Sequence, residues 1–174
     1  MGDVSIEAGE RRDGAGPGAE GFVRPAAGAV RACLFWLAGK RFAIEVQHAR
    51  EVIVLDEVTI VPRAPVYVVG VANLRGLVLP ILDIRRRLGL APRPVGRGTR
   101  VLVADGGAGQ VGIAIDAVMG LESFDEVLPV GEAAGSADAE LAAGLLKRGD
   151  DPVMLLDVGR VLDALKSGGA PSRP

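Results

Sequence analysis

The chain has 174 residues but only one cysteine, Cys33, and one histidine, His48. A single cysteine excludes an internal disulfide and any metal site built from several thiolates. His48 lies in the sequence QHAREV, with no serine, cysteine or metal-spaced partner nearby. This context favours a solvated or packed imidazole over a catalytic one. We therefore expect no metal, no cofactor and no catalytic residue, and we predict that the protein is not an enzyme.

Excess positive charge, aromatic residues and long apolar runs are also lacking. Twenty Lys and Arg against 22 Asp and Glu give a net charge of -2, and aromatic residues make up 3% of the chain. Nucleic acid is disfavoured, because a strand-binding barrel needs a basic groove and aromatic stacking platforms. The longest apolar runs, 66–72 and 77–82, fall far short of the roughly 20 residues of a membrane helix. A nucleic-acid-binding or enzymatic barrel is only a remote alternative, and no direct membrane insertion is expected.

The two ends of the chain differ from the middle in amino-acid composition. Residues 1–29 are rich in Gly and charge, follow no apolar period and resemble no secretory signal, and 167–174 are also rich in Gly, Ser and Pro. We predict a disordered leader at 1–29, a disordered tail at 167–174 and a cytoplasmic location. From Val30 onward, short runs rich in Val and Ile alternate with Gly, Pro and Asp, a pattern typical of a mostly β protein.

The first apolar runs predict a β-hairpin. The segment 32–37 is followed by Gly39-Lys40 as the turn, and the second strand places Phe42, Ile44 and Val46 on one face. Side chains of a strand alternate between its two faces. We therefore expect the second strand to be half-buried.

Two halves of the chain match when the sequence is slid over itself. At an offset of 69 the match includes the identical triplets Asp-Glu-Val at 56–58 and 125–127. At an offset of 74 the segments 82–88 and 156–162 share Leu-Asp-x-x-Arg-x-Leu, so the change of offset is one loop insertion. Chance alignment of two Val-rich stretches is the alternative, but the shared triplets and endings favour an internal duplication.

The duplication predicts two small barrels, a first at 30–92 and a second at 100–166, joined by a linker at 93–99. A copy of about 65 residues buries only about 60% of its unfolded surface and is marginal alone. The copies should therefore pack together and leave a groove at their junction. Asp83 and Asp157 each precede apolar residues at helical spacing, so a short capped helix is expected at the end of each copy.

The richest motif is GVANLRGLVLPILDIRRRLGL, residues 70–90. It resembles the signature of the CheW-type coupling proteins of bacterial chemotaxis, in which a Gly-Val-x-Asn-Leu-Arg-Gly turn precedes a strand reading Pro-x-x-Asp-Leu-Arg. The similarity extends backward through 42–71, which contains the AREV step at 49–52, and forward through 99–121 and 152–162. It covers about residues 31–166.

This resemblance implies two tandem five-stranded SH3-like barrels packed together in a non-catalytic adaptor at membrane-associated chemoreceptor arrays. The implied partners are the cytoplasmic tip of a methyl-accepting chemoreceptor, the regulatory domain of a CheA-type histidine kinase and other CheW-like domains in array rings. It also implies site residues. Those at or beside the receptor groove are Ala49, Glu51, Gly70, Asn73, Arg75 and Gly76, and those with a structural role in the second barrel are Gly112 and Gly144.

Elementary chemistry supports part of this assignment. Gly76 lies between two apolar runs, where a hairpin turn needs a positive φ, and Asn73 can bond its own backbone. Arg75 carries a guanidinium group, which can form two parallel hydrogen bonds with a carboxylate. We predict that it pairs with Glu51; the alternatives are a pair with Asp83 or a solvated loop tip.

Three features remain open at the level of sequence. Ala49 is smaller than the aliphatic residue usual in the family, which puts partner affinity in doubt. The arginines at 85–87, 93, 97 and 100 are either a solvated helix face, which we prefer, or a basic patch for acidic receptor helices or lipid head groups. The alternative function is that of an adaptor of the same fold in a chemosensory-like pathway that controls surface motility or second-messenger output.

Overall fold

The computed structural model describes residues 29–130, 140–147 and 152–166. The predicted leader, apart from Ala29, and the predicted tail lie outside these residues. Within the described ranges no helix is both long and apolar enough to cross a membrane.

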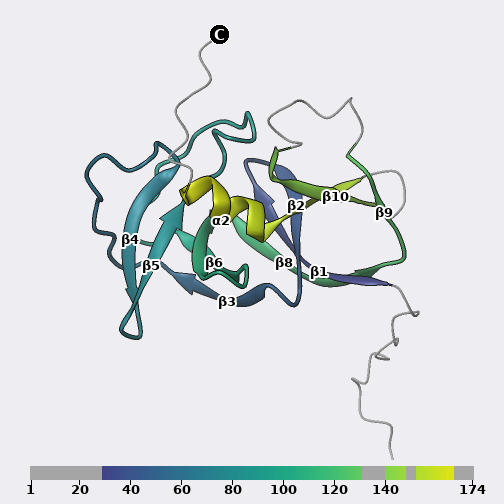
Figure 1. Cartoon of the computed structure of the whole chain (residues 1–174), viewed down its shortest axis with the longest axis horizontal. Coiled ribbons are helices and arrows are strands. Elements are labelled where there is room, and N and C mark those ends of the chain that lie inside the picture. The colour runs from purple at the N-terminus through teal and green to yellow at the C-terminus, as the bar shows by residue number, and fades with distance from the viewer. Residues whose placement is uncertain (1–28, 131–139, 148–151, 167–174) are drawn as a thin grey trace, which may run out of the picture.

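The chain folds into two β-barrels of SH3-like architecture with one helix between them (Figure 1). The first sheet has five strands in the order β3-β6-β7-β5-β4, and the second has six in the order β8-β1-β2-β11-β10-β9. The bounds are β1 Val30–Leu37, β2 Lys40–Glu45, β3 Ala49–Val54, β4 Val68–Leu74, β5 Leu77–Leu82, β6 Arg100–Asp105, β7 Gln110–Ile115, β8 Ala117–Phe124, β9 Val127–Leu128, β10 Ala142–Leu146, β11 Val153–Leu156 and α2 Val158–Lys166. The prediction of a mostly β fold is confirmed. The extra strand of the six-stranded sheet is β9, which has two residues.

The barrels do not follow the two halves of the sequence. The hairpin β1–β2 joins the sheet of β8, β10 and β11, while β6–β7 joins the sheet of β3, β4 and β5. The predicted boundaries of the barrels, 30–92 and 100–166, are therefore wrong. The first two strands of each copy belong to one sheet, and the later strands of the same copy belong to the other sheet. The segment 93–99 carries no strand and does connect the copies.

The duplication predicted from the sequence is confirmed by the pairing register. Each exchanged hairpin meets its new sheet through a parallel pair: Leu155 lies opposite Ala43 and Ile81 lies opposite Gly112. These two pairs are equivalent under the offsets of 69 and 74 found in the sequence. A bulge also recurs before Gly70 and before Gly144. The two barrels are thus the same structure built twice.

Three apolar cores result from this arrangement. Each barrel has its own interior, and the members of one interior map onto the other under the two offsets. A larger core lies between the barrels and takes residues from both sheets, such as Phe35, Ile44 and Ile113. The helix α2, yellow in Figure 1, covers this shared core with Val158, Val161 and Leu162.

The strand β2 is buried on both faces, although its alternation predicted a half-buried strand. Phe42 and Ile44 face the shared core, and Ala43 between them faces the interior of the six-stranded barrel. The turn before it is Ala38-Gly39 rather than Gly39-Lys40, with φ values of 49° and 76°. Two residues of positive φ form the tight turn that matches the twist of a hairpin.

Glycine is required where strands cross closely. A Cβ on Gly70 would lie 2.3 Å from the carbonyl oxygen of Thr59, and one on Gly144 would lie 2.8 Å from that of Leu128. Gly112 has the same constraint inside a barrel, where a Cβ would lie 2.6 Å from a methyl of Val101. These contacts support the structural role expected of Gly112 and Gly144.

The two copies end differently. In the second, Asp157 accepts a hydrogen bond from the Arg160 N–H at 3.1 Å and caps α2, as predicted. In the first, residues 85–89 form only turns, so the helix predicted there is absent. The chain stops winding at Gly89, whose φ is 63°, and Leu90 then inserts into the shared core.

Arg85 is buried at the junction of the barrels. Only 1% of it is exposed, and its guanidinium donates to Asp83 at 3.0 Å and to Asp116 at 2.9 Å. The preferred interpretation of the arginine run as a solvated helix face is therefore wrong for Arg85. Its neighbour Arg87 pairs with Glu140, and the guanidinium carbon of Arg87 lies 5.1 Å from the centre of the Tyr67 ring.

Asp116 links the two sheets at the turn between β7 and β8. Its carboxylate accepts from the Ala38 N–H at 2.6 Å, from Arg85, and from Arg93 at 3.0 Å. Partial burial on its own raises the pKa of Asp116. The Ala38 N–H and the charge and hydrogen bonds of the two arginines outweigh this and hold the pKa below its usual range.

We predict that Gly144→Ala lowers the free energy of unfolding by about 1–3 kcal/mol, because the added methyl overpacks a site bounded by backbone. Gly96→Ala is the matched control, since a Cβ there meets no atom within 4 Å. Urea denaturation measures both. Equal stability of the two variants would contradict the close crossing.

We also predict that Asp116→Asn lowers stability at neutral pH by about 1–3 kcal/mol, since it leaves buried Arg85 with one carboxylate. A carboxyl whose pKa is depressed by folding stabilises the protein above its unfolded pKa, and the benefit is lost as pH falls through the lower, folded value. The difference between wild type and variant should therefore shrink as pH drops below about 4. Urea titrations between neutral and acid pH test this, with exposed Asp56→Asn as control; a pH-independent difference would refute it.

Candidate functional site

The hairpin between β4 and β5 presents a two-residue turn, Arg75-Gly76. Both residues have positive φ, 52° and 87°. The side chain of Asn73 accepts a hydrogen bond from the Gly76 N–H at 2.8 Å, as expected for a residue that bonds its own backbone. Gly adopts this conformation freely, but Arg75 does so at a cost in strain. The turn therefore holds an arginine in an uncommon conformation at the tip of the hairpin.

Arg75 pairs with Glu51 through two parallel hydrogen bonds of 2.9 and 2.8 Å, which confirms the predicted partner. Asp83, the alternative, binds Arg85 instead. Glu51 lies on β3, so the pair joins this edge strand of the five-stranded sheet to the turn that follows the other edge strand, β4. The Arg75 side chain is 76% exposed, and an exposed pair of this kind is worth at most about 1 kcal/mol. The pair thus shapes the surface more than it stabilises the fold.

Two hollows flank the hairpin that carries this pair. One of about 370 Å³ lies between the end of β3 and β4 and is lined by Ile53, Leu55, Thr59 and residues 71–74. The other, of about 180 Å³, is lined by Leu74, residues 77–79 and Gln110. Both belong to the five-stranded barrel and its connections, whereas we expected the groove at the junction of the two barrels.

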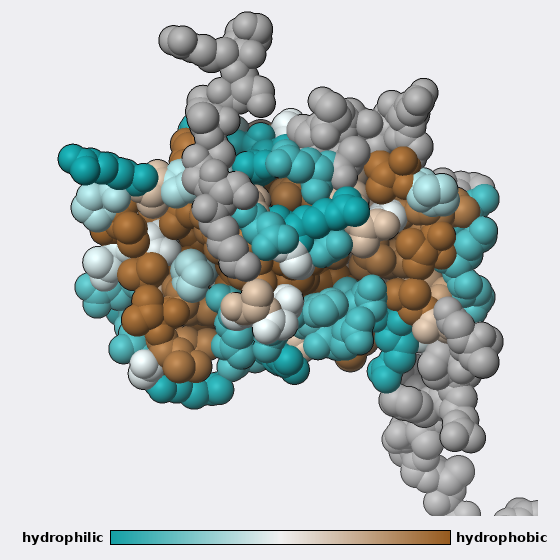
Figure 2. Space-filling view, in the orientation of Figure 1, coloured by the Kyte–Doolittle hydropathy of each residue, from teal (hydrophilic) through white to brown (hydrophobic). Residues whose placement is uncertain are grey.

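Apolar side chains are exposed around the same hairpin. The exposed fractions are 41% for Val52, 66% for Val54, 62% for Leu77 and 74% for Val78. Figure 2 shows hydrophobic surface over the region where Figure 1 draws the β4–β5 hairpin. Contiguous exposed apolar surface on a small protein marks an interaction site. An exposed ion pair next in sequence to exposed Leu77 and Val78 suits non-covalent contact with another protein.

The second copy lacks the ion pair. Under the two offsets Glu51 corresponds to Gly120 and Arg75 corresponds to Gly149. The six-stranded barrel is built on the same plan without either side chain, so the architecture does not require the pair. This comparison of the copies could have been made from the sequence and would have singled out Glu51 and Arg75 without the fold.

The remaining predicted site residues have different surroundings. Ala49 begins β3, is half-buried and packs against the shared core. Gly70 lies in β4, where it packs against Thr59. The structure therefore brings together Glu51, Asn73, Arg75 and Gly76, with Ala49 at the junction of the barrels two residues from Glu51.

A polar cluster that we did not anticipate fixes the start of β3. The His48 ring nitrogen Nδ1 donates to the Asp105 carbonyl at 2.8 Å, and Arg50 donates to the Asp105 carboxylate at 2.9 Å. The Gly107 N–H, and after it Arg50, hold the pKa of Asp105 below its usual value. These contacts tie β3 to the hairpin β6–β7. His48 therefore has a packing role, because one of its ring nitrogens is hydrogen-bonded to a backbone carbonyl.

Cys33 is buried in the shared core, and burial raises the pKa of its thiol. Within the described part of the chain, no group of three or more His, Cys, Asp or Glu side chains is arranged to hold a metal ion.

Comparison with known proteins agrees with this picture. The chain is 29% identical to a protein named "Probable chemotaxis protein CheW" from Rhizobium etli, over 78% of this chain and 89% of the relative. It is also 29% identical to "Protein FrzA" of Myxococcus xanthus, over 76% of this chain and 84% of the relative. The scaffolding protein TtCheW from Thermoanaerobacter tengcongensis has the same fold, with a TM-score of 0.66 and 23% identity, over 76% of this chain and 89% of that one.

A family model described as "CheW-like domain" matches residues 31–166, nearly the whole of the two barrels and the helix between them. The chain belongs to the CheW-like domain family, whose members are coupling and scaffold proteins of chemosensory systems.

Proposed function

We propose that this protein is a non-catalytic adaptor that couples the cytoplasmic tip of a methyl-accepting chemoreceptor to the regulatory domain of a CheA-type histidine kinase. It would act in the cytoplasm at membrane-associated arrays, where other CheW-like domains are further partners in rings. Membership of the CheW-like family supports this role. The Glu51–Arg75 pair is the single observation that carries the choice of the receptor site.

The Glu51–Arg75 pair distinguishes one copy from the other. Arg75 lies in the family's Asn-Leu-Arg-Gly motif, the pair that it forms with Glu51 is present in one copy, and the pair's stability contribution is small because it is exposed. A strained arginine held by a bidentate carboxylate is a rigid surface feature, and rigid features are favoured in recognition because little entropy is lost on binding. Exposed Leu77 and Val78 beside it supply apolar area for a helical partner.

Coupling without chemistry needs two contacts whose strengths depend on each other. The receptor would bind at the Glu51–Arg75 face, and the kinase domain would meet the end of a barrel. Each contact can be weak, because linked contacts in an assembly act at high effective concentration. A coupling free energy of about 1–3 kcal/mol is enough to change kinase output several-fold. Ala49 is expected to reduce the apolar contact available to the receptor.

A second candidate is an adaptor of the same fold in a chemosensory-like pathway that controls surface motility or second-messenger output. The similarity to the protein named FrzA supports this second candidate. The match to FrzA covers 84% of that relative, nearly as much as the 89% covered in the Rhizobium etli relative. Pull-down with receptor fragments and kinase regulatory domains from the different pathways of the source cell distinguishes the two.

We predict that Arg75→Ala removes receptor-dependent kinase stimulation and weakens binding of a receptor cytoplasmic fragment at least tenfold. Its stability should change by less than about 1 kcal/mol, because the pair is exposed. The matched control is Arg97→Ala, which breaks another exposed pair on the same barrel, with Asp56 at 3.1 Å. A reconstituted receptor and kinase assay measures the stimulation. Undiminished stimulation, or an equal loss in Arg97→Ala, would count against the site.

A second prediction concerns the floor of the site. Ala49→Val restores two methyl groups beside the shared core and should tighten receptor binding about tenfold, by roughly 0.8 kcal/mol for each buried methyl. Isothermal titration of the same receptor fragment measures the affinity. Ala143→Val, at an exposed position of β10, is the control and should leave it unchanged. Unchanged or weaker binding by Ala49→Val would show that this position does not face the partner.

A further inference from the structure

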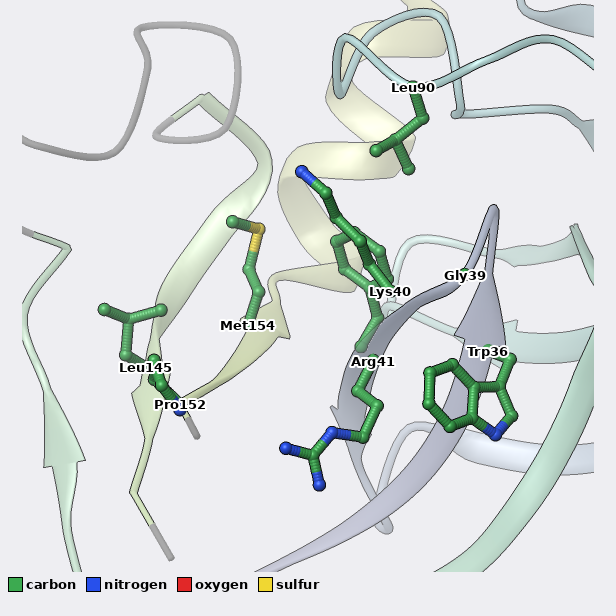
Figure 3. A pocket seen from close by; sticks show the side chains of 9 residues that line it. Trp36, Gly39, Lys40, Arg41, Leu90, Leu145, Pro152 and Met154 are labelled. Carbon is green, nitrogen blue, oxygen red and sulfur yellow. The ribbon is translucent and has the colours of Figure 1, made fainter. Parts of the chain in front are cut away.

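Two further hollows lie away from the β4–β5 hairpin. The larger, of about 390 Å³, is beside the β1–β2 turn, and Figure 3 shows Trp36, Leu145 and Met154 among the side chains that line it. The other, of about 260 Å³, is lined by the linker 93–99 and its neighbours. Its lining is more polar and includes four arginines and one acidic residue: Arg85, Arg93, Arg97, Arg100 and Asp116. We call it the arginine hollow.

Arg85 is the buried arginine of this hollow. One terminal nitrogen of its guanidinium donates to Asp83 and the other to Asp116. Its Nε–H has no hydrogen-bond partner within the described residues. A buried donor without an acceptor is uncommon in folded proteins and carries a cost in free energy. Arg85 therefore has hydrogen-bonding capacity that its two carboxylate partners do not use.

Asp116 is the acidic residue of the lining, and its charge is compensated. Its carboxylate accepts from the Ala38 N–H at 2.6 Å, from Arg85 at 2.9 Å and from Arg93 at 3.0 Å. Asp83 adds a second carboxylate beside Arg85. The two carboxylates are thus matched by the two arginines Arg85 and Arg93.

A third arginine has a neutral partner. Arg100 begins β6, and its guanidinium donates to the main-chain carbonyl of Asp116 at 3.3 Å. Arg97 lies at the rim and adds no net charge, since it pairs with Asp56 at 3.1 Å and both side chains are more than four-fifths exposed. Within the described part of the chain, the centre of the hollow therefore has three arginines against two carboxylates.

The second copy does not repeat this group of arginines. Under the offset of 74 Arg85 corresponds to Gly159, and Arg93 lies in the linker, which has no counterpart. Of the three arginines only Arg100 is matched, by Arg31 under the offset of 69. Both barrels are nevertheless built on one plan. The plan therefore does not require three arginines to converge, which points to a use other than folding.

We propose that the arginine hollow binds a phosphoryl group, carried either by a soluble compound or by a lipid headgroup. A phosphate monoester has a charge of about −1.5 to −2 and three terminal oxygens, and the planar guanidinium group binds such oxygens through paired hydrogen bonds. The three arginines come from the turn after β5, the linker and the start of β6. A tetrahedral group can accept from all of these sides, whereas a carboxylate accepts in one plane.

The size of the hollow agrees with this ligand. A space of about 260 Å³ is smaller than the sites of drug-sized molecules, which begin at about 300 Å³, and it admits a phosphoryl group with the atoms next to it. The site is separate from the Glu51–Arg75 pair and does not rest on the adaptor role.

The test is a titration of the ¹⁵N-labelled full-length protein with inorganic pyrophosphate at neutral pH, with the ionic strength held constant by sodium chloride. We expect saturable shifts of the backbone amide signals of Gly98, Thr99 and Asp116, which line the hollow. Inorganic phosphate should shift the same signals, and acetate should bind at least tenfold more weakly than pyrophosphate. Absence of a saturable shift up to a few millimolar pyrophosphate, or equal binding of acetate, would overturn the proposal.

Variants locate the binding. Arg100→Gln and Arg93→Gln should each weaken pyrophosphate about fivefold or more, because each removes one cation from the hollow. Arg86→Gln is the matched control, since Arg86 is exposed, loses the same charge and does not line the hollow; it should leave the affinity within twofold. The amide spectrum of each variant reports whether the fold is retained, and either arginine variant alone decides the result. Equal affinity of Arg86→Gln and the hollow variants would contradict the site.

Vesicles distinguish the two sources of the phosphoryl group. The protein is sedimented with phosphatidylcholine vesicles that contain phosphatidic acid, whose headgroup is a phosphate monoester. Binding that is lost in Arg100→Gln and kept in Arg86→Gln assigns the hollow to a headgroup. Pyrophosphate binding without vesicle binding assigns it to a soluble compound. Vesicle binding that is equal in both variants, with no binding of pyrophosphate, would refute the proposal. Loss of receptor binding by Arg75→Ala has no bearing on any of these outcomes.

Discussion

Burial of the apolar residues between the two barrels is the interaction on which the rest of the structure depends. The shared core takes Phe35 and Ile44 from one sheet, Leu102 and Ile113 from the other, and is covered by α2. Because each copy gives its first hairpin to the other sheet, half of the chain cannot complete even one barrel. We therefore expect the two barrels to fold together, because neither half of the chain is large enough to be stable alone.

Comparison of the copies separates what the fold requires from what was added to it. The interiors agree position by position, including the close crossings at Gly70 and Gly144. Two ion-pair sites have no counterpart at the equivalent positions: the Glu51–Arg75 pair corresponds to Gly120 and Gly149, and the Arg85–Asp116 pair corresponds to Gly159 and Gln47. The first of these pairs is on the surface and the second is at the junction of the barrels.

The sequence predicted much of the local structure and the duplication, because both depend on residues close together or on a repeated pattern. The positive φ of Gly76, the cap by Asp157 and the Glu51–Arg75 pair were all predicted correctly. The exchange of hairpins was missed, since a strand shows the same alternation whichever sheet it joins. Burial of Arg85 was missed because its partner Asp116 is 31 residues away and becomes a neighbour only through that exchange.

The proposed role requires that one molecule hold two partners at the same time. Analytical ultracentrifugation of the protein with a receptor cytoplasmic fragment and a kinase regulatory domain, alone and in pairs, tests this directly. The account predicts a ternary species, with receptor fragment and kinase domain in one complex only when this protein is present. Mutual exclusion, in which added kinase domain displaces the receptor fragment, would contradict it.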